Sequence, residues 1–391
     1  MKWEMVKLGE LCTIFGGGTP DRAKPGYWGG SIPWVTVKDF KSNTIDSAQE
    51  SITELGLKNS ASNLVKAGTI IVPTRMALGK AAVCTIDIAI NQDLKSIYIN
   101  NKNKLDRDYL LHFLISNSSY FESRGKGATV KGITLDVLRE IPIPLPPLAT
   151  QKRIAEILDK ADALRQKDQA LLRKYDELAQ AVFVDMFGDP VRNEKGWEVG
   201  SIRDIALEVK YGTSSPAQKA GKFPYLRMNN LTYSGDWDFK DLKFISLPEN
   251  EKEKYVLKNH DLVFNRTNSK ELVGKTAVYQ GHEEMVIAGY LIRVRFTDKG
   301  NPFFVSGFLN SKFGKSILLN MCKSIIGMAN INAQELQDIQ IPIPPMSIQN
   351  EYERRLKSIK MNKKVVEKSK NHSESLFQAL LQKAFTGELV P

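Results

Sequence analysis

The sequence predicts an α+β protein in which two globular domains are joined by two long antiparallel helices that form a coiled coil. The main observation is an internal repeat: the segment 140–151 returns as 338–349, and Gln151 and Gln349 lie 198 positions apart. Solenoid repeats have units of roughly 20–50 residues. A period this long therefore indicates two whole domains, each followed by its own helix and related by a pseudo-twofold axis.

The repeat also predicts where the domains begin and end. We expect a first globular domain over residues 1–148, a central spacer helix over 149–187, a second globular domain over 188–346 and a C-terminal spacer helix over 347–391. With 391 residues, 42% of them hydrophobic and 25% charged, the chain is long enough for two cored domains.

The secondary-structure pattern of the two domains is similar. Each domain opens with an amphipathic segment that fits a short helix, at 3–12 and at 197–206. Short β-branched and aromatic runs then predict strands of a mixed sheet, at 32–37, 69–73, 80–84, 225–228, 261–264, 276–279 and 291–295. The apolar runs 108–116 and 302–310 predict one buried helix in each domain.

A proline-rich strip precedes each long helix, at 142–147 and 341–345. Proline lacks the amide donor, so these strips cannot continue a helix or sit in a central strand, and we expect stiff hinges. The first long helix has a three–four apolar pattern at Ile154, Ile157, Ala161, Leu164, Leu171, Tyr175, Leu178 and Val182, with Asp168 interrupting the seam.

The second long helix repeats this pattern less cleanly. Helices of about 36 residues span roughly 55 Å, which is long enough to bridge two domains. If a twofold relates the halves, each helix covers the apolar seam of the other. The alternative is that each helix packs only on its own domain.

Composition limits the possible functions. The formal net charge of +11 points toward a polyanionic partner. Cys12, Cys84 and Cys322 are far apart and lack metal or redox spacing, so we expect buried thiols. The chain shows neither an apolar run of membrane-spanning length nor the apolar core of a signal peptide, which predicts a cytoplasmic protein.

Motifs for catalysis are incomplete. Gly274-Lys275-Thr276 resembles the end of a phosphate-binding loop, but Ser269 stands where the first glycine is required. Phe15-Gly-Gly-Gly18 lacks the tetrapeptide that would hold a target base, and the four histidines are scattered. Asp21 with Lys24 is a poor nuclease core. We therefore expect a non-catalytic chain with no metal and no cofactor of its own.

Features suited to DNA binding are better represented. Arg75 ends one strand and Arg266 ends its counterpart, and each is followed by Gly-Lys, at Lys80 and Lys275. Arginine can bridge guanine O6 and N7, asparagine can bridge adenine N6 and N7, and lysine can bind a phosphate. The loops 125–131 and 327–332 are also able to reach a groove.

These considerations give a set of candidate DNA-binding residues: Thr19, Arg22, Lys38, Arg75, Lys80, Lys126, Lys131, Arg227, Asn229, Arg266, Asn268, Lys275 and Asn330. The competing interpretation is that the cations form a solvated face. For Trp28 and Trp34, which lie among cations, the core interpretation is favoured.

At these residues the chain resembles the specificity subunit of type I restriction-modification systems. The resemblance rests on the opening Trp3 to Pro20, the block 27–34, the block 264–275 and both proline strips with their glutamines. It implies two target-recognition domains, each reading one half of a split and asymmetric double-stranded DNA target, with the helices fixing the spacing. It also implies docking of two methylation subunits, which carry S-adenosylmethionine, and of restriction subunits that use ATP and Mg.

Two other functions remain open. The chain could be a non-enzymatic coiled-coil scaffold whose domains bind protein partners. A self-contained methyltransferase or nuclease would require activity from this chain alone.

Overall fold

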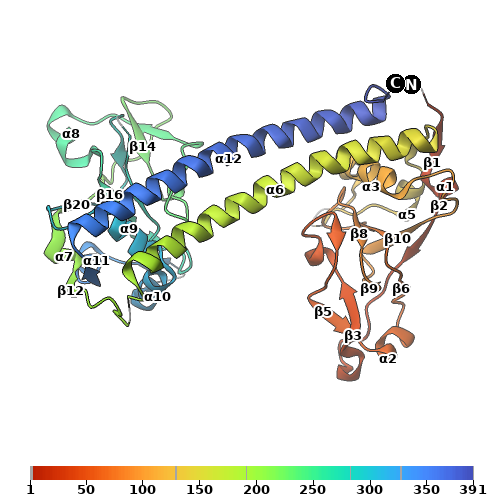
Figure 1. Ribbon diagram of the computed structural model, residues 1–391, viewed down its shortest axis with the longest axis horizontal. Helices are drawn as coiled ribbons and strands as arrows, with labels where there is room; N and C mark the ends of the chain where they lie inside the picture. Colours follow the sequence, from red (N-terminus) through yellow and green to blue (C-terminus); the bar gives the residue numbers. More distant parts are fainter. Residues whose placement is uncertain (1–2, 128–129, 191, 282, 326–327, 391) are drawn as a thin grey trace. The chain divides into compact units, whose positions relative to one another are not determined.

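The computed structural model describes residues 3–127, 130–190, 192–281, 283–325 and 328–390. It divides into two compact units, one of residues 1–168 with 369–391 and one of residues 169–368 (Figure 1). The two long helices are α6 (Leu148–Phe187) and α12 (Met346–Thr386). Each long helix therefore contributes one part of its length to each unit. His282 and parts of the predicted loops 125–131 and 327–332 lie outside the described residues.

Over its described residues, the globular part of the first unit combines three sheets with short helices. Its strands are β1 (Met5–Lys7), β2 (Cys12–Gly16), β3 (Trp28–Val35), β4 (Thr44–Ile45), β5 (Glu50–Ile52), β6 (Leu64–Val65), β7 (Ile70–Pro73), β8 (Ala82–Cys84), β9 (Ile88–Ile90), β10 (Leu94–Ile99) and β11 (Pro142–Pro144). Its helices are α1 (Leu8–Leu11), η1 (Pro25–Tyr27), η2 (Val37–Asp39), α2 (Glu54–Lys58), α3 (Arg107–Ser116), α4 (Ser118–Arg124) and α5 (Leu135–Arg139). The sheet orders are β2-β10-β7-β8-β4, β5-β3-β9-β6 and β1-β11.

The second unit has the same kinds of elements. Its strands are β12 (Glu198–Ser201), β13 (Ala206–Tyr211), β14 (Phe223–Leu226), β15 (Lys243–Ile245), β16 (Leu262–Asn265), β17 (Thr267–Asn268), β18 (Thr276–Val278), β19 (Val286–Ile287), β20 (Leu291–Phe296), β21 (Lys323–Ile325), β22 (Met328–Asn330) and β23 (Gln340–Ile343). Its helices are α7 (Ile202–Ile205), η3 (Met228–Asn230), α8 (Glu249–Tyr255), α9 (Pro302–Asn310), α10 (Lys312–Met321) and α11 (Ala333–Gln337). The sheet orders are β13-β20-β16-β18, β15-β14-β19, β17-β22-β21 and β12-β23.

The α+β prediction is confirmed, including mixed sheets, since β4 with β8 and β3 with β9 run parallel while their other pairings are antiparallel. The predicted buried helices are α3 and α9. The opening segments differ from the prediction, because only four residues of each are helical. In both units a strand precedes that short helix and pairs with the proline-rich strip.

The proline strips are therefore strands, and the expectation of bare hinges was incomplete. Met5 pairs with Pro144 and Lys7 with Pro142, in a sheet of only two strands. An edge position tolerates proline because the side without an amide donor needs no partner. The strip thus ties the start of each globular domain to the beginning of its long helix.

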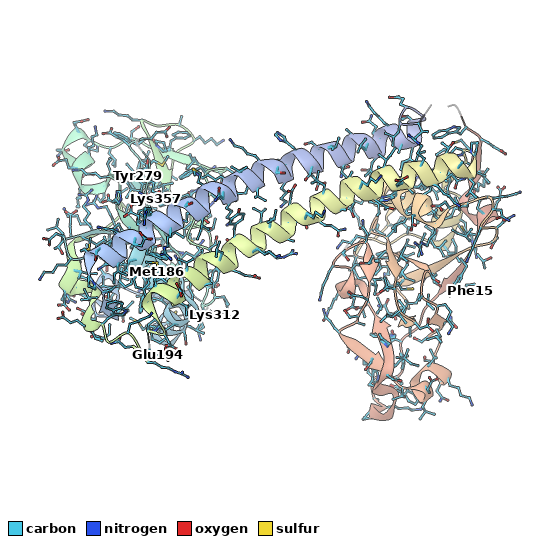
Figure 2. The ribbon with its side chains drawn as sticks, viewed as in Figure 1. Phe15, Met186, Glu194, Tyr279, Lys312 and Lys357 are labelled. Atoms are coloured by element: carbon cyan, nitrogen blue, oxygen red, sulfur yellow. The ribbon has the colours of Figure 1, made fainter. Side chains whose placement is uncertain are left out.

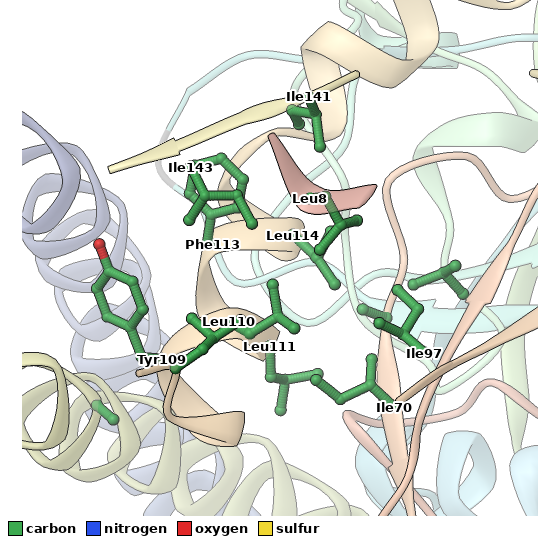
Figure 3. Packing of buried hydrophobic residues seen from close by; sticks show 14 of the residues in the cluster. Leu8, Ile70, Ile97, Tyr109, Leu110, Leu111, Phe113, Leu114, Ile141 and Ile143 are labelled. Carbon is green, nitrogen blue, oxygen red and sulfur yellow. The ribbon is translucent and has the colours of Figure 1, made fainter. Parts of the chain in front are cut away.

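The core of the first unit lies around α3 (Figure 3). Leu110, Leu111 and Leu114 pack toward sheet residues such as Ile70 and Ile97. Each buried leucine stabilises the fold by about 1.5–3 kcal/mol. In the same cluster are residues of both long helices, namely Ile154, Leu158, Phe377 and Leu381. Helix α3 therefore joins the sheet to the helix pair.

In the second unit, aromatic rings join α9 to the two long helices. The ring of Phe187 lies 4.7 Å from that of Phe304, and the ring of Phe183 lies 5.5 Å from that of Tyr352. A side chain at Gly307 would meet the Tyr352 hydroxyl at 2.6 Å, so the rings require glycine there. Helix α9 is thereby fixed against both long helices.

The antiparallel pairing of α6 and α12 is confirmed, but part of the predicted seam was wrong. Leu164, Leu171 and Leu178 are 43–45% exposed. Position 165 is the one that turns inward, where Arg165 reaches Glu374 of α12 with its guanidinium 3.1 Å from the carboxylate. A count of apolar residues misplaced the seam because part of the real seam is polar.

Asp168 belongs to that polar part. It is only 5% exposed. Its carboxylate accepts hydrogen bonds from the hydroxyls of Ser369 at 3.2 Å and Ser373 at 2.8 Å, both on α12. The residue that interrupts the apolar pattern is therefore a buried contact between the helices.

The cysteine prediction is confirmed for two of the three thiols. Cys12 and Cys84 are buried and Cys322 is partly buried, and all three are free. Burial raises the pKa of the Cys12 thiol to about 12, so this thiol stays protonated at neutral pH. In the described part of the chain no helix is long and apolar enough to cross a membrane.

Candidate nucleic-acid interface

In the first unit the turn Asn91–Asp93, just before β10, brings several loops together. The amide of Thr74 donates to Asp93 O at 2.8 Å, and the amide of Asn91 donates to Val35 O at 3.1 Å. The Thr19 hydroxyl donates to the side-chain oxygen of Gln92. This turn therefore gathers the loop after β2, the turn after β3 and the loop after β7.

Arg75 lies on the loop after β7 and is well exposed. Its side chain is 57% accessible, and its guanidinium lies 3.7 Å from the Asp93 carboxylate. A partner at that distance orients the guanidinium and leaves most of its donors open. Arg75 is thus presented at the surface with its direction set by the fold.

Residues 131–133 pack against the Arg75 loop. The amide of Met76 donates to Lys131 O at 3.3 Å, and the amide of Ile133 donates to Thr74 O at 2.9 Å. Gly132 faces Arg75, where an added side chain would come within 3.1 Å of the arginine stem. The exposed cations Lys126 and Lys131 therefore stand beside Arg75.

Lys38 and Lys80 complete this cluster. Lys38 lies in η2, whose first turn is capped by Thr36 and Asp39. The ammonium of Lys80 donates to Phe40 O at 3.3 Å, which connects the loop after β7 to that turn. Both lysines are exposed. We call Lys38, Arg75, Lys80, Lys126 and Lys131 the basic cluster.

Arg22 is placed differently. Its guanidinium makes two bonds to the Glu50 carboxylate, at 2.5 and 2.9 Å, and lies 3.7 Å above the Trp28 ring. The hydrogen bonds from Arg22 lower the pKa of Glu50. The charge of Arg22 is therefore already paired. Trp34 is buried, as the core interpretation predicts, and Trp28 is partly buried.

The second unit gathers Arg266, Asn268 and Asn330. The short sheet β17-β22-β21 pairs Thr267 with Asn330 and Asn268 with Ala329. The Arg266 guanidinium lies 4.9 Å from the Tyr211 ring centre. A guanidinium stacked on an aromatic face keeps its in-plane donors free for a partner. This site, the amide cluster of Arg266, Asn268 and Asn330, contains fewer cations than the basic cluster.

The remaining candidates surround η3. Asn229 is exposed, whereas Arg227 bonds to Asp241 at 2.9 Å. Lys275 is only 7% exposed and its ammonium donates to Met228 O at 2.5 Å. Burial lowers the pKa of Lys275. It therefore supports η3 from inside, as Lys80 supports η2, and the expected phosphate contact does not fit its position.

The candidate residues selected from the sequence do not include several exposed side chains in these parts of the two units. Phe15 on β2 (Figure 2) is 50% exposed. Its ring lies edge-on to that of Tyr98, with the ring centres 5.6 Å apart. Tyr290, in the turn before β20, is 53% exposed beside the backbone of Arg266. Gln92 occupies the related turn of the first unit. The alternation of side chains along a strand would have identified Phe15. Gln92 and Tyr290 lie in turns, and only an alignment of the two halves of the repeat would have identified them.

The described residues contain no group of three or more His, Cys, Asp or Glu side chains that could hold a metal ion. What both units offer instead is hydrogen-bond donors, cations and aromatic faces. Such groups bind phosphates, base edges and bases.

Comparison with known proteins gives a family match. A family model described as the type I restriction modification DNA specificity domain matches residues 1–173 and 194–373. The first match contains the basic cluster and the second contains the amide cluster. The internal repeat therefore coincides with two copies of one family domain.

Individual relatives agree. The chain is 28% identical over 253 residues to the MjaIX type I restriction enzyme specificity subunit of Methanocaldococcus jannaschii, covering 59% of this chain and 58% of that protein. It is 27% identical over 303 residues to the EcoKI specificity subunit of Escherichia coli, covering 72% and 65%. The chain thus spans less than two thirds of these two relatives. It is 24% identical over 416 residues to the MjaVIII specificity subunit of Methanocaldococcus jannaschii, covering 99% and 93%.

Solved structures show the same fold. The type I restriction-modification S subunit from M. genitalium superposes with a TM-score of 0.62 at 14% identity, covering 98% of this chain and 96% of that one. A chain from a structural study of complex assembly in a type I R-M system superposes with a TM-score of 0.57 at 18% identity, covering 99% and 98%.

Proposed function

Because the chain belongs to the type I restriction modification DNA specificity family, we propose that it is a sequence-specific DNA-binding subunit that reads a bipartite target. The family model matches the chain twice, and this double match is the observation that carries the proposal. Each globular domain then reads one half of the target, and the paired helices hold the two halves at a fixed spacing.

The surface chemistry supports DNA as the partner. Five exposed cations gather on loops of the first unit that contact one another. Cations that replace condensed counterions on phosphates bind DNA with a steep salt dependence. Arg75 and Arg266, both oriented by neighbouring groups, are the best placed to contact base edges.

The two sites differ enough to favour an asymmetric target. The basic cluster has four lysines and one arginine, whereas the amide cluster has two asparagines, one arginine and the exposed ring of Tyr290 nearby. Asparagine suits adenine and arginine suits guanine. Two domains with different side chains read different half-sites.

Catalysis and cofactors belong, in this proposal, to partner subunits. The chain docks two methylation subunits that carry S-adenosylmethionine and, in a larger assembly, restriction subunits that use ATP and Mg. The chain itself needs no cofactor and works in the cytoplasm. A coiled-coil scaffold that binds proteins is the alternative, and it predicts no sequence-dependent affinity for DNA.

Arg75 and Arg266 test the assignment directly. Duplexes selected from a random library by the purified complex define the target, and binding is then measured for Arg75→Ala and Arg266→Ala. We expect each variant to lose about 1–3 kcal/mol of affinity and to relax preference in one half-site only.

Arg107→Ala is the matched control, because Arg107 is exposed on α3 and paired with Asp108 at 2.8 Å, outside either cluster. Equal losses in all three variants would indicate general electrostatics. Failure to select any sequence would favour the scaffold.

A further inference from the structure

Each unit has a loop that leaves its 3-10 turn and contacts a long helix. In the first unit this loop follows η2, and the Asn43 amide donates to the Asp162 carboxylate of α6 at 3.2 Å. In the second unit it follows η3, and the Asp236 carboxylate lies 2.6 Å from the Lys360 ammonium of α12. The Lys360 ammonium also donates to Gly235 O at 3.2 Å.

These two contacts occupy equivalent places in the repeat. Asp162 and Lys360 are 198 positions apart, the same separation as Gln151 and Gln349. Both loops also run beside the equivalent strands β8 and β18. Asn43 O accepts from the amide of Val83. Gly235 lies against Thr276, where an added side chain would come within 2.9 Å of Thr276 O.

Near each loop contact, an ion pair joins α6 to α12, and its charge pattern is the same in both units. In the first unit Arg165 of α6 pairs with Glu374 of α12 at 3.1 Å. In the second unit Lys363 of α12 pairs with Asp176 of α6 at 2.6 Å. Position 165 corresponds to 363, and position 374 to 176, so a cation faces an anion in both.

At the loop contact, by contrast, both residues differ in charge between the two units. The helix position is an anion in the first unit, Asp162, and a cation in the second, Lys360. The loop position is a neutral amide in the first unit, Asn43, and a carboxylate in the second, Asp236. Each helix residue thus has a loop partner of suitable charge in its own unit.

These groups are sheltered enough for their charges to matter. Asp162 is 6% exposed. The side chains of Asp236, Lys360 and Lys363 are 33%, 26% and 16% exposed. Burial alone would raise the pKa of Asp236, but Lys360 and Lys363 together lower it. Partly buried charges interact more strongly than surface charges because solvent screens them less.

We propose that these contacts form a key that matches each recognition domain to its own helix. Asp236 and Lys360 are positioning residues for the second domain, and Asn43 and Asp162 for the first. A second domain seated on the first helix would bring Asp236 against Asp162, whose carboxylate already pairs with Arg165 at 2.7 Å, so that two carboxylates would share one sheltered contact. Recognition domains are therefore not freely exchangeable between the two positions unless the helix residue changes with them.

Substitutions in the full chain test the key. Lys360→Asp places two carboxylates together, and we expect a lower unfolding temperature and at least about tenfold weaker recognition of one half-site. Adding Asp236→Asn recreates the Asn–Asp pair of the first unit and should restore most of both. Lys364→Asp is the matched control, since it makes the same charge change at an exposed position of α12.

The outcomes separate the key from a general loss of fold. Rescue by Asp236→Asn supports the key, because a second substitution that only weakened packing would destabilise further. The key is overturned if Lys360→Asp behaves as Lys364→Asp does, or if the double variant is no better than the single one. The consequence for DNA recognition rests on the proposed function, whereas the unfolding temperatures do not and remain informative if the wild-type chain selects no DNA.

An exchange of domains gives an independent test. A chain is made in which residues 188–345 replace residues 1–147, so that the second domain stands at both positions. We expect this chain to unfold at a low temperature, and Asp162→Lys within it to raise that temperature. Equal unfolding temperatures with and without Asp162→Lys would overturn the key.

Discussion

One buried glutamine fixes each globular domain to its long helix. The Gln151 side chain accepts from the amide of Asp106 and donates to Lys104 O and Pro146 O, all at 2.8 Å. Gln349 repeats these bonds in the second unit with Asn301, Lys299 and Pro344. Both glutamines are fully buried. A side chain that satisfies three backbone groups at once explains why the same residue stands at both places.

Replacing Gln151 should therefore be costly. Gln151→Leu keeps the volume but leaves a part-buried amide, a part-buried carbonyl and a buried carbonyl without this partner. We expect a loss of about 2–4 kcal/mol in the free energy of unfolding. Urea denaturation followed by circular dichroism measures it. Gln169→Leu, at an exposed position of the same helix, should change stability little. Similar values for the two variants would contradict this account.

Lys315 predicts a pH dependence. Burial, with a smaller contribution from Lys275, lowers its pKa from 10.5 to about 8. Between these two pH values the unfolded chain holds a proton that the folded chain lacks, so this group adds stability as pH rises from about 8 to about 10.5. Below about 8 the buried charge remains a cost, although its ammonium donates to Gly274 O.

The measurement is the free energy of unfolding of wild type and Lys315→Met from pH 7 to pH 10.5. The advantage of the variant over the wild type should shrink across this range, by about 1–3 kcal/mol. Lys312→Met, at an exposed position of α10, should differ from the wild type by the same amount at every pH. A constant difference for Lys315→Met would rule out the predicted titration.

At the residue scale, the sequence indicated which types of side chain gather at the sites and less well where they point. Arg75 and Arg266 follow from their places at equivalent strand ends. The burial of Lys275 does not follow from the sequence, because Lys80 stands at the equivalent position before the equivalent strand and is exposed. Tyr290 and Gln92 were missed because turn residues leave no periodic signal.

At the level of elements, the apolar periodicity of the long helices predicts their existence and pairing but not the detailed seam between them. Their existence and antiparallel pairing were predictable from the repeat and from the three–four pattern. The detailed seam was not, because Arg165 and Asp168 take inward positions beside exposed leucines. A polar residue in a seam costs stability and specifies register.

Asp168 should accordingly set the register of the pair. Asp168→Ala leaves the hydroxyls of Ser369 and Ser373 without this acceptor, and we expect a loss of about 1–3 kcal/mol. Asp168→Leu with Ser373→Leu makes the seam apolar and should recover stability while permitting slippage. Cysteine cross-linking between the helices reports register, and one unchanged set of cross-links in the double variant would contradict the role of Asp168.

For the whole molecule, the 198-residue separation of Gln151 and Gln349 was the most informative feature of the sequence. It predicted two domains and two helices, because only a duplicated domain repeats over such a length. Sheet order was not predictable, since pairing such as β2-β10-β7-β8-β4 joins strands that are far apart in the chain. Short strands of this kind carry little information about their neighbours.

The spacing function of the helices gives a prediction at this scale. Four residues inserted after Leu171, matched by four inserted before Ser369, lengthen both helices by about one turn, roughly 6 Å. We expect the complex to accept a longer spacer between unchanged half-sites, as judged by duplexes with graded spacers. Preference for the original spacer would show that the helices do not set the distance.

The most direct measurement is a map of N6-methyladenine in host DNA after co-expression of this chain with its cognate methylation subunit. The account predicts a split motif with a methylated adenine in each half, and altered preference in only one half for Arg75→Ala and in the other for Arg266→Ala. An assembled complex that adds no methylation, or that methylates an unsplit motif, would contradict it.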